Sequence, residues 1–205
     1  MKLSVEKTKH ASRWKKHIAD KFGEKKGQAI MNEVNELYEK LCIENSGSTP
    51  ELKEHTEKII YPLIALYEVL KNYTDNENAM EFTEECFFES VHMQEKTLKN
   101  FINSNNLASS FPETFAEEFR KSYSEKAGFR TEFIVTEKRK TRFNILECPY
   151  EKITSGLNCP ELCHCFCKAD EICYSGISPE LKWHREHTLA ENGSYCDFCL
   201  EYTEQ

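Results

Sequence analysis

The sequence lacks a hydrophobic run long enough to cross a membrane. The longest apolar stretch lies around residues 59 to 70, and it is interrupted by Tyr61, Pro62, Tyr67 and Glu68. A membrane-spanning helix needs about 20 consecutive apolar residues, so we expect no membrane partner. The first ten residues also lack the apolar segment and the small-residue cleavage site of a secretory signal. We therefore expect a cytoplasmic protein.

The sequence also lacks an excess of positive charge. It contains 27 Lys and Arg residues against 35 Asp and Glu residues, for a net charge of −8 at pH 7. Proteins that bind nucleic acid broadly carry a basic surface, so the composition argues against that class. The segment from Lys2 to Lys26 is locally basic, but a charge run of this kind is more typical of a solvated helix face.

Cysteine, in contrast, is abundant, with ten residues in 205. In a reducing cytoplasm such cysteines are thiols, metal ligands or catalytic groups rather than a disulfide framework. Four of them lie in the twelve-residue stretch Cys-Pro-Glu-Leu-Cys-His-Cys-Phe-Cys-Lys-Ala-Asp, residues 159–170. Ordinary core packing does not require this density, so the stretch is the first candidate for a functional site.

Read as a helix, this stretch presents one polar face. At 3.6 residues per turn, Cys159, Cys163 and Cys167 lie on the same side, and Asp170 follows three residues after Cys167. His164 precedes Cys167 by three residues and can form a hydrogen bond with its thiol or lower its pKa. Cys165 points away from this face.

The pattern of apolar residues changes once along the chain. Helical spacing is found up to about residue 127, with breaks near Gly23–Gly27, at 45–50, at Tyr61-Pro62, at 75–78 and at 103–110, and Gly128 ends the last helix. Alternation then predicts a hairpin of strands 129–135 and 141–148, and two further strands at 181–189 and 195–202 joined by a tight turn at 190–193. We therefore predict an α+β fold forming one compact domain. Its N-terminal helical bundle, residues 1–127, packs on a small C-terminal antiparallel sheet with the Cys-rich helix inserted, residues 128–205.

Several short segments, concentrated after residue 140, carry a family resemblance. They are Pro62-Leu63-Ile64-Ala65-Leu66-Tyr67, Cys148, the segment from Gly156 through Cys159-Pro160-Glu161-Leu162-Cys163 to Phe166-Cys167 and Asp170, Arg185 with Thr188-Leu189-Ala190, Gly193, and Cys196-Asp197-Phe198. Together they resemble the L-2-amino-thiazoline-4-carboxylic acid hydrolase family. Members of that family are linked to hydrolytic opening of the thiazoline ring of a cyclic cysteine precursor. The resemblance implies an enzyme for a small carboxylate-bearing thiazoline or cyclic amidine. Cys165, Cys173 and Cys199 are additional to the family pattern.

Such a reaction adds water, or a thiolate followed by water, at the amidine-like ring carbon and expels the ring sulfur. It needs a nucleophile or water activator, an acid for the leaving sulfur, and a cation for the substrate carboxylate. Cys167 is the nucleophile candidate, with Asp170 or His164 as the proton carrier. Arg185 is suited to hold a carboxylate with two hydrogen bonds. Further candidates for substrate contacts are Cys163, Cys148, Glu161 and Cys196, and we expect no cofactor.

Two other functions remain open from the sequence. The thiols of Cys159, Cys163, Cys167 and Cys196 are enough for a zinc ion or an iron–sulfur cluster, although Cys196 and Cys199 face opposite sides of a strand. The same thiols also suit a non-enzymatic sensor of small molecules or redox state. Arg185, in turn, can pair within the fold with Asp170 or Asp197 instead of binding substrate. The oligomeric state is not indicated.

Overall fold

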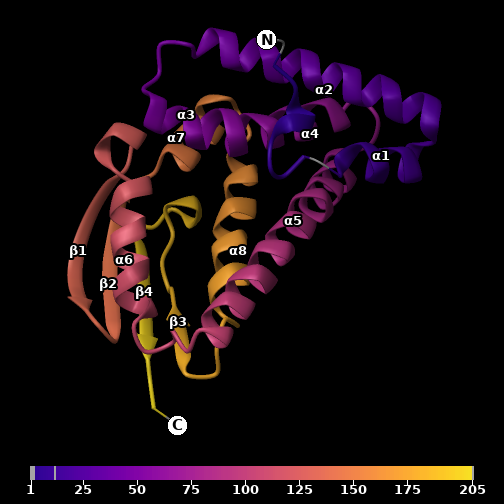
Figure 1. Ribbon diagram of the computed structural model, residues 1–205. Helices are drawn as coiled ribbons and strands as arrows, with labels where there is room; N and C mark the ends of the chain where they lie inside the picture. The colour runs from indigo at the N-terminus through magenta and orange to yellow at the C-terminus, as the bar shows by residue number, and fades with distance from the viewer. Residues whose placement is uncertain (1–2, 12, 205) are drawn as a thin grey trace. The chain divides into compact units, whose positions relative to one another are not determined.

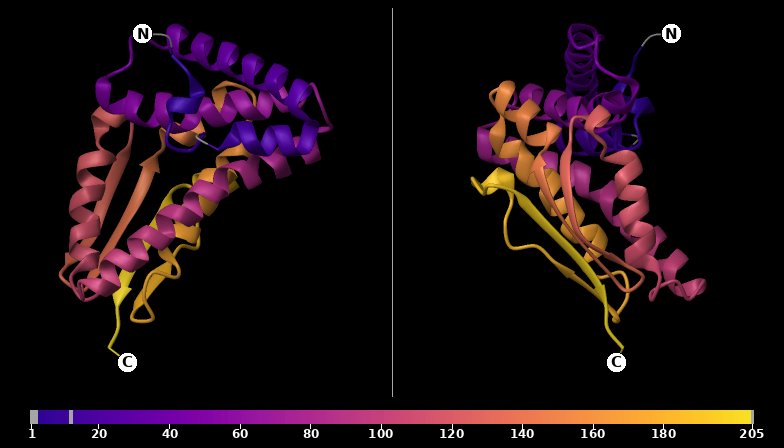
Figure 2. Two further views of the ribbon diagram at one scale, coloured as in Figure 1. Left: turned by 45° about the vertical axis from the view of Figure 1, so that its right-hand side comes forward. Right: turned by 90° about the vertical axis from the view of Figure 1, so that its left-hand side faces the viewer.

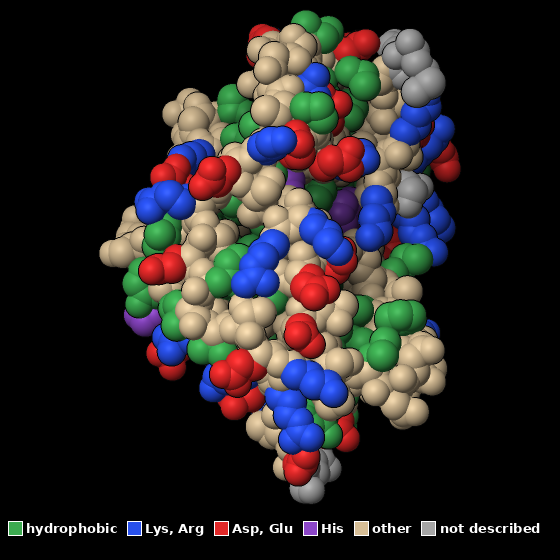
Figure 3. Space-filling view, turned by 60° about the vertical axis from the view of Figure 1, so that its left-hand side comes forward, with side chains coloured by type: hydrophobic (Ala, Val, Ile, Leu, Met, Phe, Trp, Pro, Cys, Tyr) green, Lys and Arg blue, Asp and Glu red, His purple; other side chains and the backbone are tan. Residues whose placement is uncertain are grey.

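The structure is a computed structural model that describes residues 3–11 and 13–204. The chain divides into two compact units, Met1–Ser90 and Val91–Gln205, and the boundary falls within one long helix. The change from helical to alternating sequence near residue 128 lies inside the second unit. No helix among the described residues is both long and apolar enough to cross a bilayer. On the face drawn in Figure 3, basic and acidic side chains are interspersed.

The first unit is helical. Its elements are a 3₁₀ turn at Val5–Lys7, α1 (Trp14–Phe22), α2 (Glu24–Glu44), α3 (Pro50–His55), a π-helical turn at Thr56–Ile60, α4 (Tyr61–Leu70) and the first half of α5 (Asn76–Ser104) (Figure 1). The predicted break between the first two helices is confirmed at Gly23, which has a φ of 82° that glycine adopts without strain. Gly27 of α2 lies close to α1, because a Cβ on it would come within 3.0 Å of the Ala19 Cα.

The predicted interruption at Pro62 is also present. The helix widens into a π-helical turn immediately before Tyr61, and α4 then begins with Pro62 in its first turn. Because the residues before Pro62 are helical too, its missing N–H leaves the Glu57 carbonyl without an intrahelical donor, and the Tyr38 hydroxyl donates to that oxygen at 2.9 Å. A π-helical turn inserts one extra residue, which lets the chain continue in the same direction around the proline.

The second unit combines helices with one sheet. Its elements are the second half of α5, α6 (Phe111–Ser122), 3₁₀ turns at Glu125–Ala127, Pro160–Leu162 and Leu189–Glu191, β1 (Arg130–Glu137), β2 (Lys140–Glu147), α7 (Pro149–Gly156), α8 (Cys163–Tyr174), β3 (Leu181–His184) and β4 (Cys196–Tyr202). Within residues 3–11 and 13–204 the sheet has four strands in the order β1-β2-β4-β3, and all neighbouring strands are antiparallel. The predicted α+β class is confirmed, as is the Cys-rich helix between the hairpin and the last strands.

Helix α6 lies against one face of the sheet (Figure 2), and an aromatic cluster joins the two. Phe143 on β2 is fully buried and stacks on Phe198 of β4 with a centroid distance of 5.1 Å. Phe115 and Phe119 of α6 contact Phe143 from the helix side. This cluster holds β4 in place, and β4 in turn carries residues of the candidate site.

Alternation on β4 is confirmed. Cys196, Phe198 and Leu200 are buried, whereas Asp197 and Cys199 are half-buried on the opposite face. A strand places successive side chains on opposite sides, which is why two residues three positions apart face different surroundings.

Two predicted boundaries are wrong. Helix α8 begins at Cys163 rather than at Cys159, because Pro160 opens a separate 3₁₀ turn and Cys159 before it is not helical. Cys159 is buried, and it does not share a helical face with Cys163.

The second error concerns the strand predicted at 181–189, which ends at His184. The Asp197 carboxylate accepts the backbone N–H groups of Glu186 and His187, at 3.0 and 2.6 Å, so these donors are not available to a sheet ladder. In place of the tight turn at 190–193, a 3₁₀ turn follows and ends at Asn192 in the left-handed conformation.

Candidate active site

The helix α8 presents two thiols, one turn apart, at the centre of the candidate site. Cys163 is buried and Cys167 is half-buried. A hydrogen bond from the Cys163 thiol is the main cause that holds the pKa of Cys167 below its ordinary value, and Arg185 acts in the same direction. Burial and the nearby Asp170 oppose this shift. The same hydrogen bond raises the pKa of Cys163, so Cys167 loses its proton more readily than Cys163.

Arg185 reaches this helix from the segment that follows β3. Its Nη2 donates to the Cys167 carbonyl oxygen at 2.7 Å, and its Nη1 donates to Asp170 Oδ2 at 3.3 Å. The guanidinium also lies over the Phe198 ring, at 5.5 Å from the centroid, and the side chain is 9% exposed. The pairing of Arg185 with Asp170, which the sequence left as an alternative, therefore occurs in the fold. The two hydrogen bonds of Arg185 use two of the about five N–H donors of its guanidinium.

The carboxyl group of Asp170 has a raised pKa. Burial raises its pKa to about 6, and Arg185 acts in the opposite direction. Its side chain nevertheless keeps 34% of its surface exposed. A carboxyl group with a pKa near neutrality can exchange protons in a reaction at pH 7. Asp170 lies behind Arg185, and it is not among the residues that line the cleft described next.

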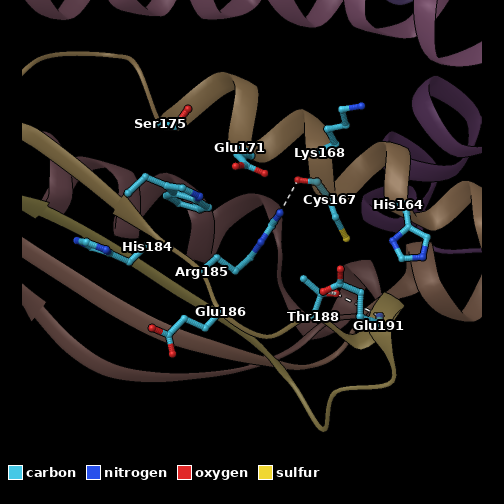
Figure 4. A pocket seen from close by; sticks show the side chains of 11 residues that line it. His164, Cys167, Lys168, Glu171, Ser175, His184, Arg185, Glu186, Thr188 and Glu191 are labelled. Carbon is cyan, nitrogen blue, oxygen red and sulfur yellow. Dashed lines mark hydrogen bonds between the residues drawn. The ribbon is translucent and has the colours of Figure 1, made fainter.

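A cleft of about 640 Å³ opens between α8 and the segment 183–191 (Figure 4). Its lining residues are His164, Cys167, Lys168 and Glu171 from α8, Ser175 directly after this helix, and Trp183, His184, Arg185, Glu186, Thr188 and Glu191 from the facing segment. In Figure 4 the Cys167 sulfur points toward Thr188 and Glu191. The fold thus brings three predicted site residues, His164, Cys167 and Arg185, to one open cavity.

The other predicted cysteines lie behind this cleft. The thiols of Cys148 and Cys196 are close enough to influence each other and Cys167 electrostatically. Burial raises the pKa of Cys148 to about 12 and that of Cys196 to about 11, so both are protonated at neutral pH. The Leu189 N–H also donates to the Cys196 sulfur at 3.2 Å. These thiols therefore surround Cys167 as neutral groups.

Glu161 and Cys159 lie at the start of the Cys-rich stretch and do not line the cleft. Across residues 3–11 and 13–204, no three His, Cys, Asp or Glu side chains converge as metal ligands would. The alternative set of Cys159, Cys163, Cys167 and Cys196 is therefore not gathered around one point in this structure. The metal content of anaerobically purified protein tests that alternative directly.

The sequence interpretation did not predict the wall of the cleft that Thr188 and Glu191 form. The Thr188 hydroxyl accepts the Glu191 N–H at 3.2 Å and donates to Glu191 Oε2 at 2.9 Å. This is the capping pattern of a Thr followed three residues later by a Glu, and it fixes both side chains at the cleft. The pattern Thr-Leu-Ala-Glu in the sequence is the signal that identifies this turn.

The fold and the cleft define an α+β protein with an activated thiol beside a buried guanidinium. A family model described as L-2-amino-thiazoline-4-carboxylic acid hydrolase matches residues 53–200, and the chain belongs to this family. This match includes the Cys-rich stretch, Arg185 and most of the sheet. The family name is that of a hydrolase.

A search of curated proteins found no match. Among solved structures, the chain is similar to one described as a crystal structure of Fe(II) unliganded H-NOX protein from K. algicida. The identity is 14%, the alignment covers 95% of each chain, and the TM-score is 0.32. A similarity this weak carries no argument about fold or function.

Proposed function

We propose that this protein hydrolyses a small carboxylate-bearing thiazoline or related cyclic amidine, such as 2-amino-thiazoline-4-carboxylate, and that Cys167 is the nucleophile. The observation that carries the proposal is the lowered pKa of a thiol that lines an open cleft next to a guanidinium. A thiolate is the nucleophilic form of cysteine, so Cys167 is better prepared for attack than Cys148 or Cys196. Family membership supplies the substrate class.

The proposed reaction has two steps. In the first, the Cys167 thiolate adds to the ring carbon between nitrogen and sulfur, the ring carbon–sulfur bond breaks, and the leaving sulfur takes a proton to become a free thiol. In the second, water adds to the S-linked isothiourea, the bond to Cys167 breaks, and a carbamoylated amine is released with the thiolate restored. One proton of the water goes to the nitrogen of the C=N bond, the other replaces the proton given to the leaving sulfur, and no cofactor is required.

Three neighbours of Cys167 have roles in this proposal. His164 lines the cleft from the same helix, and its imidazole can give a proton to the leaving sulfur and recover it from water. Arg185 keeps N–H donors beyond its bonds to Asp170 and Cys167, and these bind the substrate carboxylate. Asp170 orients Arg185, and its raised pKa makes it the second proton carrier.

Ring opening releases a thiol, so a thiol reagent follows turnover directly. We expect Cys167→Ser and Cys167→Ala to lower kcat at least about a hundredfold, because neither side chain forms a thiolate. Cys199→Ser is the matched control, because Cys199 is half-buried on the opposite face of β4. Thermal unfolding of each variant verifies that it is folded. Wild-type turnover by a folded Cys167→Ala protein would refute the nucleophile, and no turnover by the wild type would favour a sensor.

Arg185→Lys tests the carboxylate site. Lysine keeps the charge but loses the planar fork, so we expect KM to rise about tenfold with a smaller change in kcat. An unchanged KM in a folded Arg185→Lys protein would show that Arg185 acts only within the fold.

A further inference from the structure

A second cavity continues the cleft along α8 and β3. It has a volume of about 340 Å³ and is lined by Lys99, Ser175, Gly176, Ser178, Pro179, Leu181, Lys182, Trp183 and His184. Ser175, Trp183 and His184 line both cavities. All of these residues belong to the second unit. The two spaces therefore form one elongated groove with Cys167 toward one end and Lys99 and Lys182 toward the other.

The two ends of this groove differ in charge. The Cys167 end is lined by three carboxylates, Glu171, Glu186 and Glu191, as well as by cations. The far end is lined by Lys99 and Lys182 and by no carboxylate. Both lysines are exposed, and Lys182 Nζ donates to the Pro179 carbonyl oxygen at 2.9 Å, which leaves its other two donors. The nearby Glu180 accepts a hydrogen bond from the Ser178 hydroxyl, and the Lys182 charge also helps to hold the pKa of Glu180 below its ordinary value. One carboxylate beside two lysines leaves an excess of positive charge. The far end thus favours an anionic group.

The wall between the two ends is a sheet edge. Among the strands in the described part of the chain, β3 is an outer one and pairs only with β4. The Thr203 N–H donates to the Glu180 carbonyl, so the backbone of Glu180 faces β4. Along an antiparallel strand, residues whose backbone groups face the partner strand alternate with residues whose backbone groups face away from it. Trp183 is three positions beyond Glu180, so its own N–H and C=O point away from β4. An extended peptide can bind such an edge through main-chain hydrogen bonds.

The length of the groove sets the length of its ligand. Ser175, the residue directly after α8, lies eight residues after Cys167, which corresponds to about 12 Å of helix at about 1.5 Å per residue. An extended chain covers about 3.3–3.6 Å per residue. Ser175 lines both cavities, so a ligand that reaches from Cys167 to the start of the second cavity is about three to four residues long. A cavity of about 640 Å³ lies within the usual range of ligand pockets and has room for a ligand larger than a single small ring.

We propose that the preferred substrate is a short peptide whose N-terminal cysteine is cyclised as a 2-aminothiazoline, and whose free C-terminal carboxylate lies between Lys99 and Lys182. This inference rests on the proposed function and extends its substrate. The ring lies at Cys167, the backbone of the two or three following residues pairs with the edge at Trp183, and Arg185 donates to the first peptide carbonyl. The bonds formed and broken at the ring are those given above.

Three compounds test the inference: 2-amino-thiazoline-4-carboxylate, its extension by two alanines with a free carboxylate, and the same extension with a C-terminal amide. We expect kcat/KM for the extended acid to exceed that for the amide about tenfold, because a charge-assisted hydrogen bond is worth about a factor of ten. We also expect the extended acid to exceed the small acid. Lys182→Ala and Lys99→Ala should each lower the ratio of kcat/KM for the extended acid to kcat/KM for the extended amide toward one. Lys138→Ala, which changes an exposed lysine in the β1–β2 turn, should leave that ratio intact.

Binding is measured in parallel by tryptophan fluorescence, since Trp183 lines both cavities and the other tryptophan, Trp14, is buried in the first unit. Equal kcat/KM for the extended acid and amide, or a ratio unaffected by both lysine variants, would overturn the inference while the proposed function stands. Lysine-dependent binding of the extended acid without turnover of any compound would support the groove and overturn the proposed hydrolysis. Neither binding nor turnover would overturn both.

Discussion

Replacing Cys163 by alanine removes the group that most favours the Cys167 thiolate. The wild-type Cys163 thiol donates a hydrogen bond to Cys167, and this bond is the main reason that the pKa of Cys167 is lowered. In the variant, burial and Asp170 continue to disfavour the thiolate, and Arg185 alone acts in its favour. We therefore expect the pKa of Cys167 to rise and its reactivity at neutral pH to fall.

The size of this effect follows from the hydrogen bond that is lost. A hydrogen bond to a charged group contributes about 1.5–3 kcal/mol, and about 1.4 kcal/mol corresponds to a tenfold change in an equilibrium. The fraction of Cys167 present as thiolate at pH 7 should therefore fall about ten- to a hundredfold. Alkylation by iodoacetamide follows that fraction, because the thiolate is the reacting form.

The assay measures the rate of Cys167 alkylation against pH, with the modified residue located by mass spectrometry of fragments. Cys163→Ser keeps a donor at the same position, so we expect it to recover most of the wild-type rate. Cys165→Ala is the matched control, because Cys165 is a buried residue of the same helix. A folded Cys163→Ala protein whose Cys167 reacts at the wild-type rate at pH 7 would refute the hydrogen bond as the cause of the lowered pKa.

Three further variants test the fold and the surroundings of the site. Phe143→Ala should reduce the free energy of unfolding by about 3–5 kcal/mol in urea, because its fully buried ring is at the centre of the aromatic cluster. Gly193→Ala should lower the free energy of unfolding by about 1–3 kcal/mol, since the new Cβ would lie 2.7 Å from the Thr188 carbonyl oxygen. Gly156→Ala is the control and should change that energy little, because a Cβ at Gly156 would have nothing within 4 Å. The raised pKa of Asp170, about 6 against 3.8, means that the folded state binds more protons than the unfolded state between these values. Wild-type stability relative to Asp170→Asn should therefore fall as pH rises from about 4 through 6. The whole pKa shift corresponds to about 3 kcal/mol of unfolding free energy, and we expect about 1–2 kcal/mol because about a third of the Asp170 side chain is exposed to solvent. A stability difference between the two proteins that does not change with pH would contradict this prediction.

The sequence by itself determined the local structure of most of the chain. Helical spacing, the break at Gly23 and the proline at the start of α4 identify helices, because these features act through the backbone of neighbouring residues. Alternation likewise identifies the β1–β2 hairpin and the two faces of β4. The grouping of thiols on α8 also follows from helical period alone, which is why Cys167 could be singled out before the fold was known.

The tertiary structure alone decided what surrounds that thiol. Arg185 could have met Asp170, Asp197 or only solvent, and the choice depends on how the segment after β3 crosses α8. Asp197, eleven residues after Glu186, ends the third strand by taking backbone donors that the local pattern assigned to a ladder. These interactions join residues that are distant in sequence, and their geometry comes from packing around the aromatic cluster. The spacing of apolar residues does not predict these contacts. It indicates on which face of a helix or strand a residue lies, but not which other element packs against that face.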